Sequence, residues 1–329
     1  MEYTILLLPR NDQLYWEQAQ ALATAELQVL NQRIMMGKLA QVWPGKVGDM
    51  PCISFQAPEL GQDELKLLAA LSFCYGAFAR AGELLLPLNL PRPDYFPEDI
   101  LSHNYSSRAN GAYIAMLYNV TLWSGAFAPQ FTSRLRVLAP LCGRGALLRY
   151  GLYRGHDVDG LEADKAAVQA VDEFFSRYLK EHRFKHSFHR ERFKRRQGGM
   201  GNKFLVQGAP DKERAKGNPF ASMVVGDDPT AANDHYAKNT YHAIVAELPK
   251  GEGQSSQDLL QQALPAWVKV LRPGGSLGLT WDLSSLPREA MSLQLSRAGL
   301  KVLDEAPYSD FVHQVGAAAR RDLVVAQKI

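Results

Sequence analysis

The alternation of apolar and polar positions divides the 329-residue chain into two parts. In the first part, strand-like apolar runs are separated by stretches of helical spacing, one beginning after Asp12 and one running from Asp63 to about Arg80. This order predicts a small α+β domain over residues 1–90. A proline-rich segment then predicts a linker over 91–100. The strand-like runs of the first part are 3–8, 52–57 and 83–88.

Residues 101–329 form the second part, in which strands and helices alternate in the way that is typical of a parallel sheet. An apolar helix is expected from Asn110, before the first strand. The predicted fold class is α/β, with a Rossmann-like open sheet of seven strands whose last two form a hairpin. The expected strands are 136–141, 157–162, 222–227, 242–248, 275–282, 299–307 and 321–329.

Composition indicates a soluble globular protein, because 46% of the residues are hydrophobic and 22% are charged. These values exclude collagenous, low-complexity and disulfide-scaffold proteins. The three cysteines are scattered, without the close pairs of zinc or redox motifs, and favour a reducing, cytoplasmic location. The N-terminal apolar run at 5–8 is too short for a signal peptide, and no run approaches the ~20 apolar residues of a membrane span.

A glycine-rich turn follows the first strand of the second part. There, a leucine-rich strand runs into Gly143 and Gly145, then an apolar helix, then a second strand that ends on Glu162. The glycines allow a tight turn and a close approach of a ligand to the backbone, and the helix offers free N–H groups. The carboxylate of Glu162 is placed to accept hydrogen bonds from a ribose diol. A full G-x-G-x-x-G is absent because Leu148 occupies the third position. The pattern predicts a site for a nucleoside cofactor, with an ordinary strand-to-helix turn as the alternative.

Three further motifs follow in chain order: Gly226-Asp227-Asp228, Glu247-Leu248-Pro249-Lys250, and the turn LRPGGSLGL before the fifth strand. With the glycine turn, they resemble the class I S-adenosylmethionine-dependent methyltransferases over about residues 100 to 329. Within that superfamily, APLCGRG at 139–145 is most similar to the THUMP-associated tRNA guanosine-N2 methyltransferases. The upstream segment NYSSRANGAYIAMLYNV at 104–120 is similar to a bacterial RNA methylase-like subgroup, in which a basic, Asn-containing turn precedes the helix before the glycine strand. The resemblance implies S-adenosylmethionine as cofactor and a THUMP-like or ferredoxin-like N-terminal domain.

The resemblance also implies which residues surround the cofactor. Those of the glycine turn would contact its methionine part, Glu162 its ribose and Asp227 its adenine amine. One departure is Ala139, which stands where the family has an acid that helps to hold the cofactor's ammonium group. The implied cofactor-binding residues are Asn110, Pro140, Cys142, Gly143, Gly145, Glu162, Ala163, Asp227 and Asp228.

The tetrapeptide at 247–250 carries the expected catalytic residues. An exocyclic base amine is a poor nucleophile, so two acceptors must hold its hydrogens while its lone pair points at the methyl group. The Glu247 carboxylate and the Leu248 carbonyl are these acceptors, and Pro249 stiffens the turn. Lys250 replaces the family's base-stacking aromatic, for which Trp281, Tyr308 and Phe311 are candidate substitutes if they are not core residues.

The tetrapeptide favours methylation of a base amine, of the guanine N2 type, in tRNA or another structured RNA. Because Ala139, Glu247 and Lys250 depart from the family pattern, the alternative is a protein that keeps the fold but binds RNA or another partner without turnover. A small-molecule or protein methyltransferase is a third hypothesis. The oligomeric state stays open.

A basic insertion over 177–203 is the strongest charge feature. From 177 to 196, nine Lys or Arg residues stand against two glutamates, a sum of +7, so the net charge of +3 for the whole chain leaves −4 elsewhere. Interleaved aromatics favour an RNA-facing element over a solvated charged surface. His182, His186 and His189 have helical spacing, but no acidic ligands complete an obvious metal-binding set, so we expect no metal. The predicted RNA-binding residues are Arg183, Lys185, Arg192, Lys194, Arg195, Arg196 and Lys250.

Overall fold

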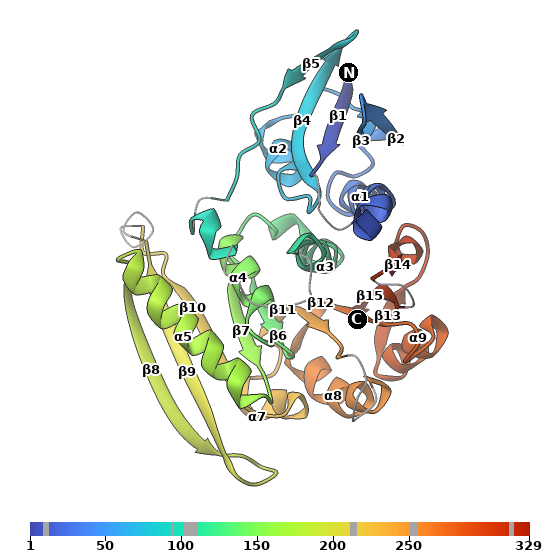
Figure 1. The fold of residues 1–329 in the computed structure, drawn as a ribbon. Coiled ribbons are helices and arrows are strands. Elements are labelled where there is room, and N and C mark those ends of the chain that lie inside the picture. The colour runs from blue at the N-terminus through green and yellow to red at the C-terminus, as the bar shows by residue number, and fades with distance from the viewer. Residues whose placement is uncertain (9–12, 94, 102–110, 211–215, 250–255, 316–318) are drawn as a thin grey trace.

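The computed structural model describes residues 1–8, 13–93, 95–101, 111–210, 216–249, 256–315 and 319–329. Two β-sheets organise the molecule, and the N-terminal sheet sits above the helices that cover the larger sheet (Figure 1). Among the helices of these ranges, no segment is long and apolar enough to cross a bilayer.

The N-terminal sheet is antiparallel and has the strand order β2-β3-β1-β4-β5. Its first four strands and two helices follow the βαββαβ order of a ferredoxin-like unit, to which β5 adds an edge strand. The elements are β1 (Glu2–Leu7), α1 (Gln13–Arg33), β2 (Ala40–Val47), β3 (Met50–Gln56), α2 (Gln62–Leu68), β4 (Cys74–Ala81) and β5 (Leu84–Pro87).

The predicted helix from Asp63 to about Arg80 is wrong in its second half. Helix α2 ends at Leu68, and residues 74–81 form β4, which pairs with β1. Alanine and leucine favour helix, but pairing with β1 overrides that local preference. Strand β2 was not predicted, because Pro44 and Gly45 interrupt its pattern. Both residues are tolerated there since β2 is an edge strand.

The larger sheet has the order β13-β15-β12-β11-β6-β7-β10-β9-β8. Strands β12, β11, β6, β7 and β10 are parallel, and β15 inserts antiparallel between β12 and β13. The predicted Rossmann-like methyltransferase sheet of seven strands is therefore confirmed. Its strands are β6 (Arg136–Ala139), β7 (Asp157–Leu161), β10 (Phe220–Val225), β11 (Tyr241–Glu247), β12 (Leu271–Asp282), β13 (Leu300–Leu303) and β15 (Arg320–Lys328).

Helices cover both faces of this sheet, and α3 and α4 lie on the face toward the N-terminal sheet (Figure 1). The short strand β14 (His313–Gln314) pairs with β15. The helical elements are η1 (Glu98–Leu101), α3 (Gly111–Trp123), η2 (Ala128–Gln130), α4 (Ala146–Tyr153), α5 (Lys165–Glu181), η3 (Pro229–Ala231), α7 (Ala232–His235), α8 (Ser256–Val270), α9 (Arg288–Arg297) and η4 (Tyr308–Phe311).

The basic insertion forms the end of α5 and then a long hairpin of β8 (Lys185–Lys194) and β9 (Met200–Ala209). Strand β9 pairs antiparallel with β10, so the hairpin extends the sheet past its third parallel strand. In Figure 1 the hairpin runs along α5 and projects beyond it. The helical spacing assumed for its histidines is wrong, because His186 and His189 lie in β8, whereas His182 caps the C-terminus of α5.

A buried polar network joins the N-terminal sheet to the larger one. Glu26 of α1 accepts hydrogen bonds from Asn119 Nδ2 of α3 (2.9 Å) and from Ser72 Oγ (2.5 Å). Tyr150 of α4 donates to Asn119 Oδ1 at 3.0 Å. Since Glu26 and Asn119 are both fully buried, these bonds fix α1 against α3 and α4.

We expect the Glu26 carboxyl to make folding pH-dependent. Burial raises the pKa of Glu26 to about 7 from its usual value of 4.5. The folded protein therefore holds a proton that the unfolded chain has already lost, and stability falls as pH rises from 4.5 through 7, by about 3 kcal/mol in total. Urea unfolding of wild type and Glu26→Gln at a series of pH values measures this. The variant should lack the fall, and identical pH profiles would contradict the assignment.

Candidate functional site

The turn between β6 and α4 brings the predicted glycines against the end of β7. Gly143 and Gly145 have φ angles of +50° and +85°, which favour glycine, and Gly145 is the N-cap of α4. The Gly143 N–H donates to Glu162 Oε2 at 2.8 Å, and the Asp164 N–H donates to Glu162 Oε1 at 2.9 Å. The turn and the acid at the tip of the second strand thus form one unit, as the sequence predicts.

The two glycines differ in the space around them. A Cβ on Gly143 would meet no atom within 4 Å, whereas one on Gly145 would come within 3.2 Å of Val171. Gly145 is therefore needed for close packing against α5, and Gly143 leaves open space over the backbone beside Glu162. This open space adjoins a half-buried carboxylate and the first turn of α4, the two groups that hold the ribose and the polar part of a ligand in nucleotide-binding α/β folds.

Three neighbours of the turn have side chains directed into the protein. Ala139 and Pro140 are buried at the end of β6, and Cys142 is also buried. A Cβ on Gly160 would lie 2.9 Å from Cys142 Sγ, so the thiol packs against β7, and burial raises the pKa of Cys142 well above its usual range. Cys142 therefore offers a cofactor its backbone and not its thiol. Ala163 is exposed beside Glu162.

Asp227, the predicted adenine acid, is buried at the end of β10 and already has partners. Its Oδ2 accepts from His235 Nε2 at 2.8 Å, and its Oδ1 accepts from the Asp228 N–H at 2.9 Å. Arg195 Nε lies 3.8 Å from Oδ1. Asp228 caps η3 by accepting from the Thr230 N–H at 2.9 Å. An adenine amine would have to share Asp227 with these groups.

Glu247 and Leu248 stand at the end of β11, where both of the predicted acceptors face Arg321 of β15. Arg321 Nη1 donates to Glu247 Oε1 at 2.5 Å, and Nη2 donates to the Leu248 carbonyl at 3.4 Å. The carboxylate and the carbonyl oxygen therefore face one position, as the binding of an amine requires, but the Arg321 guanidinium occupies that position. Pro249 is exposed, and the Leu248 side chain is buried in the core.

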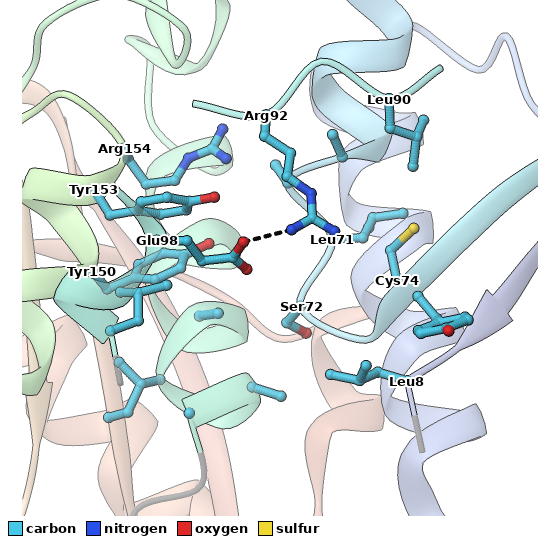
Figure 2. A pocket seen from close by; sticks show the side chains of 18 of the residues that line it. Leu8, Leu71, Ser72, Cys74, Leu90, Arg92, Glu98, Tyr150, Tyr153 and Arg154 are labelled. Atoms are coloured by element: carbon cyan, nitrogen blue, oxygen red, sulfur yellow. Dashed lines mark hydrogen bonds and ion pairs between the residues drawn. The ribbon is translucent and has the colours of Figure 1, made fainter. Parts of the chain in front are cut away.

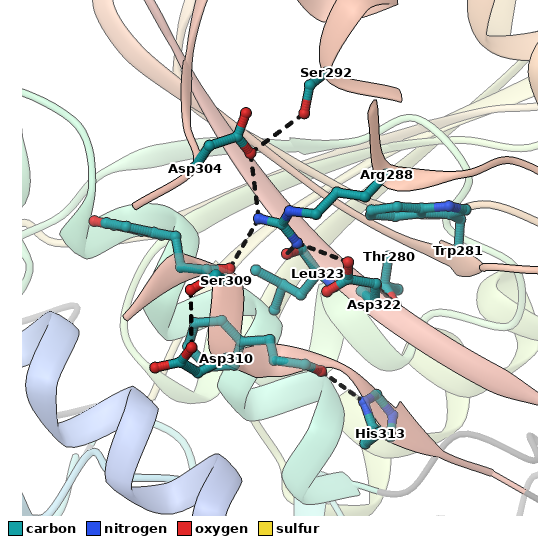
Figure 3. Close-up of polar contacts among 12 residues, drawn as sticks. Thr280, Trp281, Arg288, Ser292, Asp304, Ser309, Asp310, His313, Asp322 and Leu323 are labelled. Carbon is teal, nitrogen blue, oxygen red and sulfur yellow. Dashed lines mark hydrogen bonds and ion pairs between the residues drawn. The ribbon is translucent and has the colours of Figure 1, made fainter. Parts of the chain in front are cut away.

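Arg321 is held in place by its neighbours on β15. Next to it, Asp322 is fully buried and forms an ion pair of 2.6 Å with Arg288 Nη1 (Figure 3). Arg288 also donates to the Tyr308 carbonyl at 2.9 Å, so α9 and η4 are tied to the same strand. Burial is the largest influence on Asp322 and raises its pKa. This network positions the start of β15, and with it Arg321, at the carboxyl ends of β11 and β12.

No family model matches the sequence, and no curated protein matches it. Solved structures of methyltransferases are similar in fold. TrmN from Thermus thermophilus matches with 15% identity and a TM-score of 0.41, over 88% of this chain and 59% of TrmN. The TehB-like SAM-dependent methyltransferase from Corynebacterium glutamicum matches with 14% identity and a TM-score of 0.37, over 59% of this chain and 80% of that one.

The [4+2]-cyclase SpnF also matches, with 15% identity and a TM-score of 0.40, over 72% of this chain and 86% of that one. All three TM-scores lie below 0.5. The fold assignment therefore rests on the strand order described above.

The three candidate substitutes for a base-stacking aromatic belong to the core. Trp281 is fully buried and its Nε1 donates to the Leu286 carbonyl at 2.7 Å. Tyr308 is 3% exposed and bonds to Ser124 and Arg33, and Phe311 is fully buried. Their interpretation as core residues is confirmed.

The predicted RNA-binding residues divide into those that lie near a carboxylate and those that are exposed without one. Arg195 is half-buried against Asp227, and Arg196 is exposed with Nη1 3.8 Å from Asp234 Oδ2. Lys250, like the cofactor candidate Asn110, lies outside the described residues. The remaining four are exposed, and within the described ranges none has a carboxylate within 4.0 Å: Arg183, Lys185, Arg192 and Lys194.

The aromatics interleaved with these charges face the protein, which corrects the expectation that bases stack on them. Tyr178 is buried, and Phe184 packs against Phe96. Phe188 lies 5.3 Å from the ring of Phe204, while Arg190 covers its outer side at 4.0 Å. Phe193, five positions further along β8, points to the opposite face of the sheet and packs 4.8 Å from the ring of His235, so the two aromatics of β8 anchor the hairpin on both faces.

The three histidines of the insertion do not converge. His182 Nε2 is 2.8 Å from Asp99 Oδ2, and His186 Nδ1 is 2.7 Å from the Phe184 carbonyl. Within the ranges that the structure describes, no group of three or more His, Cys, Asp or Glu side chains could hold a metal ion.

Sequence reasoning missed Arg321 and His235, the partners of Glu247 and Asp227. For Arg321 a signal exists. A hairpin of the last two strands makes the final strand antiparallel, so its first residues, Arg320 and Arg321, must lie at the edge where the parallel strands end. His235 carries no such signal, because α7 is a helix of four residues that follows a short turn.

Proposed function

We propose that this protein is an S-adenosylmethionine-dependent methyltransferase. The observation that carries the proposal is the unit formed by Gly143 and Glu162 at the carboxyl edge of the sheet, with open space over the glycine. Glu162 would accept hydrogen bonds from the ribose hydroxyls, and the first turn of α4 would face the polar end of the cofactor. When bound, the cofactor supplies an electrophilic methyl group on its sulfonium.

We further propose that the methyl acceptor is an exocyclic base amine, of the guanine N2 type, in tRNA or another structured RNA. The Glu247 carboxylate and the Leu248 carbonyl would accept the two amine hydrogens, since Arg321 presents two N–H groups to them in that way. Holding both hydrogens aims the nitrogen lone pair at the methyl carbon. Arg321 must move aside before an amine can take its place.

The RNA would contact the basic hairpin. The exposed cations Arg183, Lys185, Arg192 and Lys194 have no carboxylate within 4.0 Å in the described ranges, so they are available for phosphates. Action on cellular RNA is the reason to place the protein in the cytoplasm.

Arg321 also supports a second candidate function, in which the protein binds cofactor and RNA without turnover. The guanidinium occupies both acceptors with an ion pair of 2.5 Å, and its side chain is only 13% exposed. If that pair persists in the complex with RNA, an amine has no acceptor and no transfer follows.

Methyl transfer from labelled S-adenosylmethionine to RNA from cells lacking the protein, followed by nucleoside mass spectrometry, tests the proposal. We expect label in a base methylated on an exocyclic amine. Binding of cofactor and RNA without incorporation would support the second candidate. Incorporation into protein or small molecules alone would contradict the RNA assignment.

A further inference from the structure

Two adjoining cavities lie between the N-terminal sheet and α4. The first has a volume of about 590 Å³ and is lined by residues 69–72 of the N-terminal part and by one side of α4. The second, of about 490 Å³, is lined by residues 91–93 of the linker, by residues 132–134 and by Lys216 and Asn218. Arg92 and Arg154 line both cavities. Figure 2 shows the two side chains extending into the same opening, Arg92 from the linker and Arg154 from the end of α4. The two cavities therefore meet at these two arginines, and together we call them the trough.

The second cavity is strongly cationic. Its described lining includes five cations and no Asp or Glu: Lys66, Arg92, Arg134, Arg154 and Lys216. Some of this charge is offset from outside the lining. Lys66 pairs with Asp63 at 2.8 Å, Arg92 with Glu98 at 2.6 Å, and Arg134 with Asp157 at 3.6 Å. The first two pairs are exposed and weak, so a net positive field remains in the cavity.

Arg154 is the arginine of this cavity whose charge no described carboxylate offsets. Its Nε is buried and, within the described part of the chain, has no hydrogen-bond partner. Its guanidinium lies over the ring of Phe131 at 4.8 Å, and no carboxylate of the described residues lies within 4.0 Å of it. The guanidinium of Arg134 lies over the ring of Tyr95 at 5.3 Å, but its Nη1 and Nη2 already donate to the backbone carbonyls of Pro219 and Asn218. Arg154, held by an aromatic ring and without such partners among the described residues, presents its Nη groups for bidentate binding of phosphate.

The trough leads from these cations to the glycine turn. The first cavity runs past Tyr150 and Tyr153 to Ala146, the residue that follows Gly145, and to Gly111 at the start of α3. Its length, aromatic edges and cationic mouth suit a chain of nucleotides more than a single phosphate, since a strand needs several charges followed by room for bases.

We propose that this trough binds a phosphodiester strand of the RNA substrate, with Arg92 and Arg154 on its phosphates. The N-terminal part of the chain then holds the substrate over the carboxyl edge of the larger sheet. The inference rests on the proposed action on RNA and adds a binding site distinct from the basic hairpin.

Anisotropy of a labelled, unmodified tRNA transcript at a series of KCl concentrations, without cofactor, tests the site. Arg154→Gln should weaken binding about tenfold and reduce the slope of log K against log[salt] by about 0.7 to 0.9, which is one phosphate contact. Arg92→Gln/Arg154→Gln should reduce the slope by about twice that amount. Glu98→Gln removes a carboxylate from the trough and should strengthen binding about two- to fivefold.

Two controls keep the test sharp. Arg297→Gln removes the same charge from an exposed position of α9 and should change neither the affinity nor the slope. Arg154→Lys should retain most of the slope if Arg154→Gln folds poorly.

Wild-type affinity and slope in both Arg154→Gln and the double variant, or no RNA binding by wild type, would overturn the inference. The inference would also be overturned if inorganic pyrophosphate bound to wild type but not to Arg154→Gln while the two proteins bound RNA with equal affinity. The anisotropy experiment contains no cofactor, so it tests binding separately from methyl transfer. RNA binding that depends on Arg154, together with no methyl transfer in the labelled-cofactor assay, would refute the proposed activity and leave this binding site in place.

Discussion

Replacing Glu162 by alanine is expected to weaken S-adenosylmethionine binding by about 10- to 150-fold, the loss of one charge-assisted hydrogen bond of ~1.5 to 3 kcal/mol. The carboxylate is half-buried, is fixed by the N–H groups of Gly143 and Asp164, and lies beside the open space over Gly143. No other carboxylate of the described chain bonds to the glycine turn. Calorimetric titration of wild type and variant measures the effect.

Glu173→Ala is the matched control, because Glu173 is an exposed glutamate on the neighbouring helix α5 and bonds only to Gln169 within the described part. It should bind the cofactor as wild type does. Equal affinities in Glu162→Ala and Glu173→Ala, with unchanged melting temperatures, would remove Glu162 from the cofactor site.

Replacing Glu247 by alanine should lower kcat for methyl transfer by about 10²-fold or more, since one of two fixed acceptors of the amine hydrogens is lost. Cofactor affinity should stay within about threefold of wild type, because Glu247 lies at the end of β11 and not at the glycine turn. Single-turnover transfer with labelled cofactor, beside calorimetry, separates the two quantities.

The variant leaves Arg321, 13% exposed, without its carboxylate, so Glu247→Ala/Arg321→Met serves as the folding control. Transfer should be lost in both variants. Arg321→Ala alone should transfer at least as fast as wild type, because the acceptors are then free. Activity that appears only in Arg321→Ala would identify Arg321 as an inhibitory group, and undiminished turnover in Glu247→Ala would exclude Glu247 from catalysis.

The larger sheet is predictable from the sequence because its central strands are buried on both faces and therefore appear as short apolar runs between helical segments. Strand β4 is not, because residues 74–81 are rich in alanine and only the pairing with β1 makes them a strand. The hairpin of β8 and β9 was not predicted, for a similar reason. Phe188 and Phe193 of β8 are five positions apart among charged residues and so show no period of two, and the apolar positions that pack the hairpin lie on the partner strand β9 as well.

Local motifs placed Gly143 and Glu162 in one predicted cofactor site, because a strand, turn and helix constrain residues that are close in the chain; the hydrogen bond between them was not predicted. Contacts between distant segments were out of reach. Arg321 meets Glu247 across 74 positions, and Arg92 and Arg154 share a cavity only because the linker folds back over α4. Single arginines scattered along the chain form no sequence pattern, whereas the dense run of charged residues at 177–196 is visible in the sequence.

Calorimetric titration of the intact protein with S-adenosylmethionine and S-adenosylhomocysteine tests the central claim most directly. The unit of Gly143 and Glu162 predicts one binding site for each ligand, with heat that is strongly reduced in Glu162→Ala. No detectable binding of either ligand to wild type at millimolar concentration would contradict the claim that this sheet holds the cofactor.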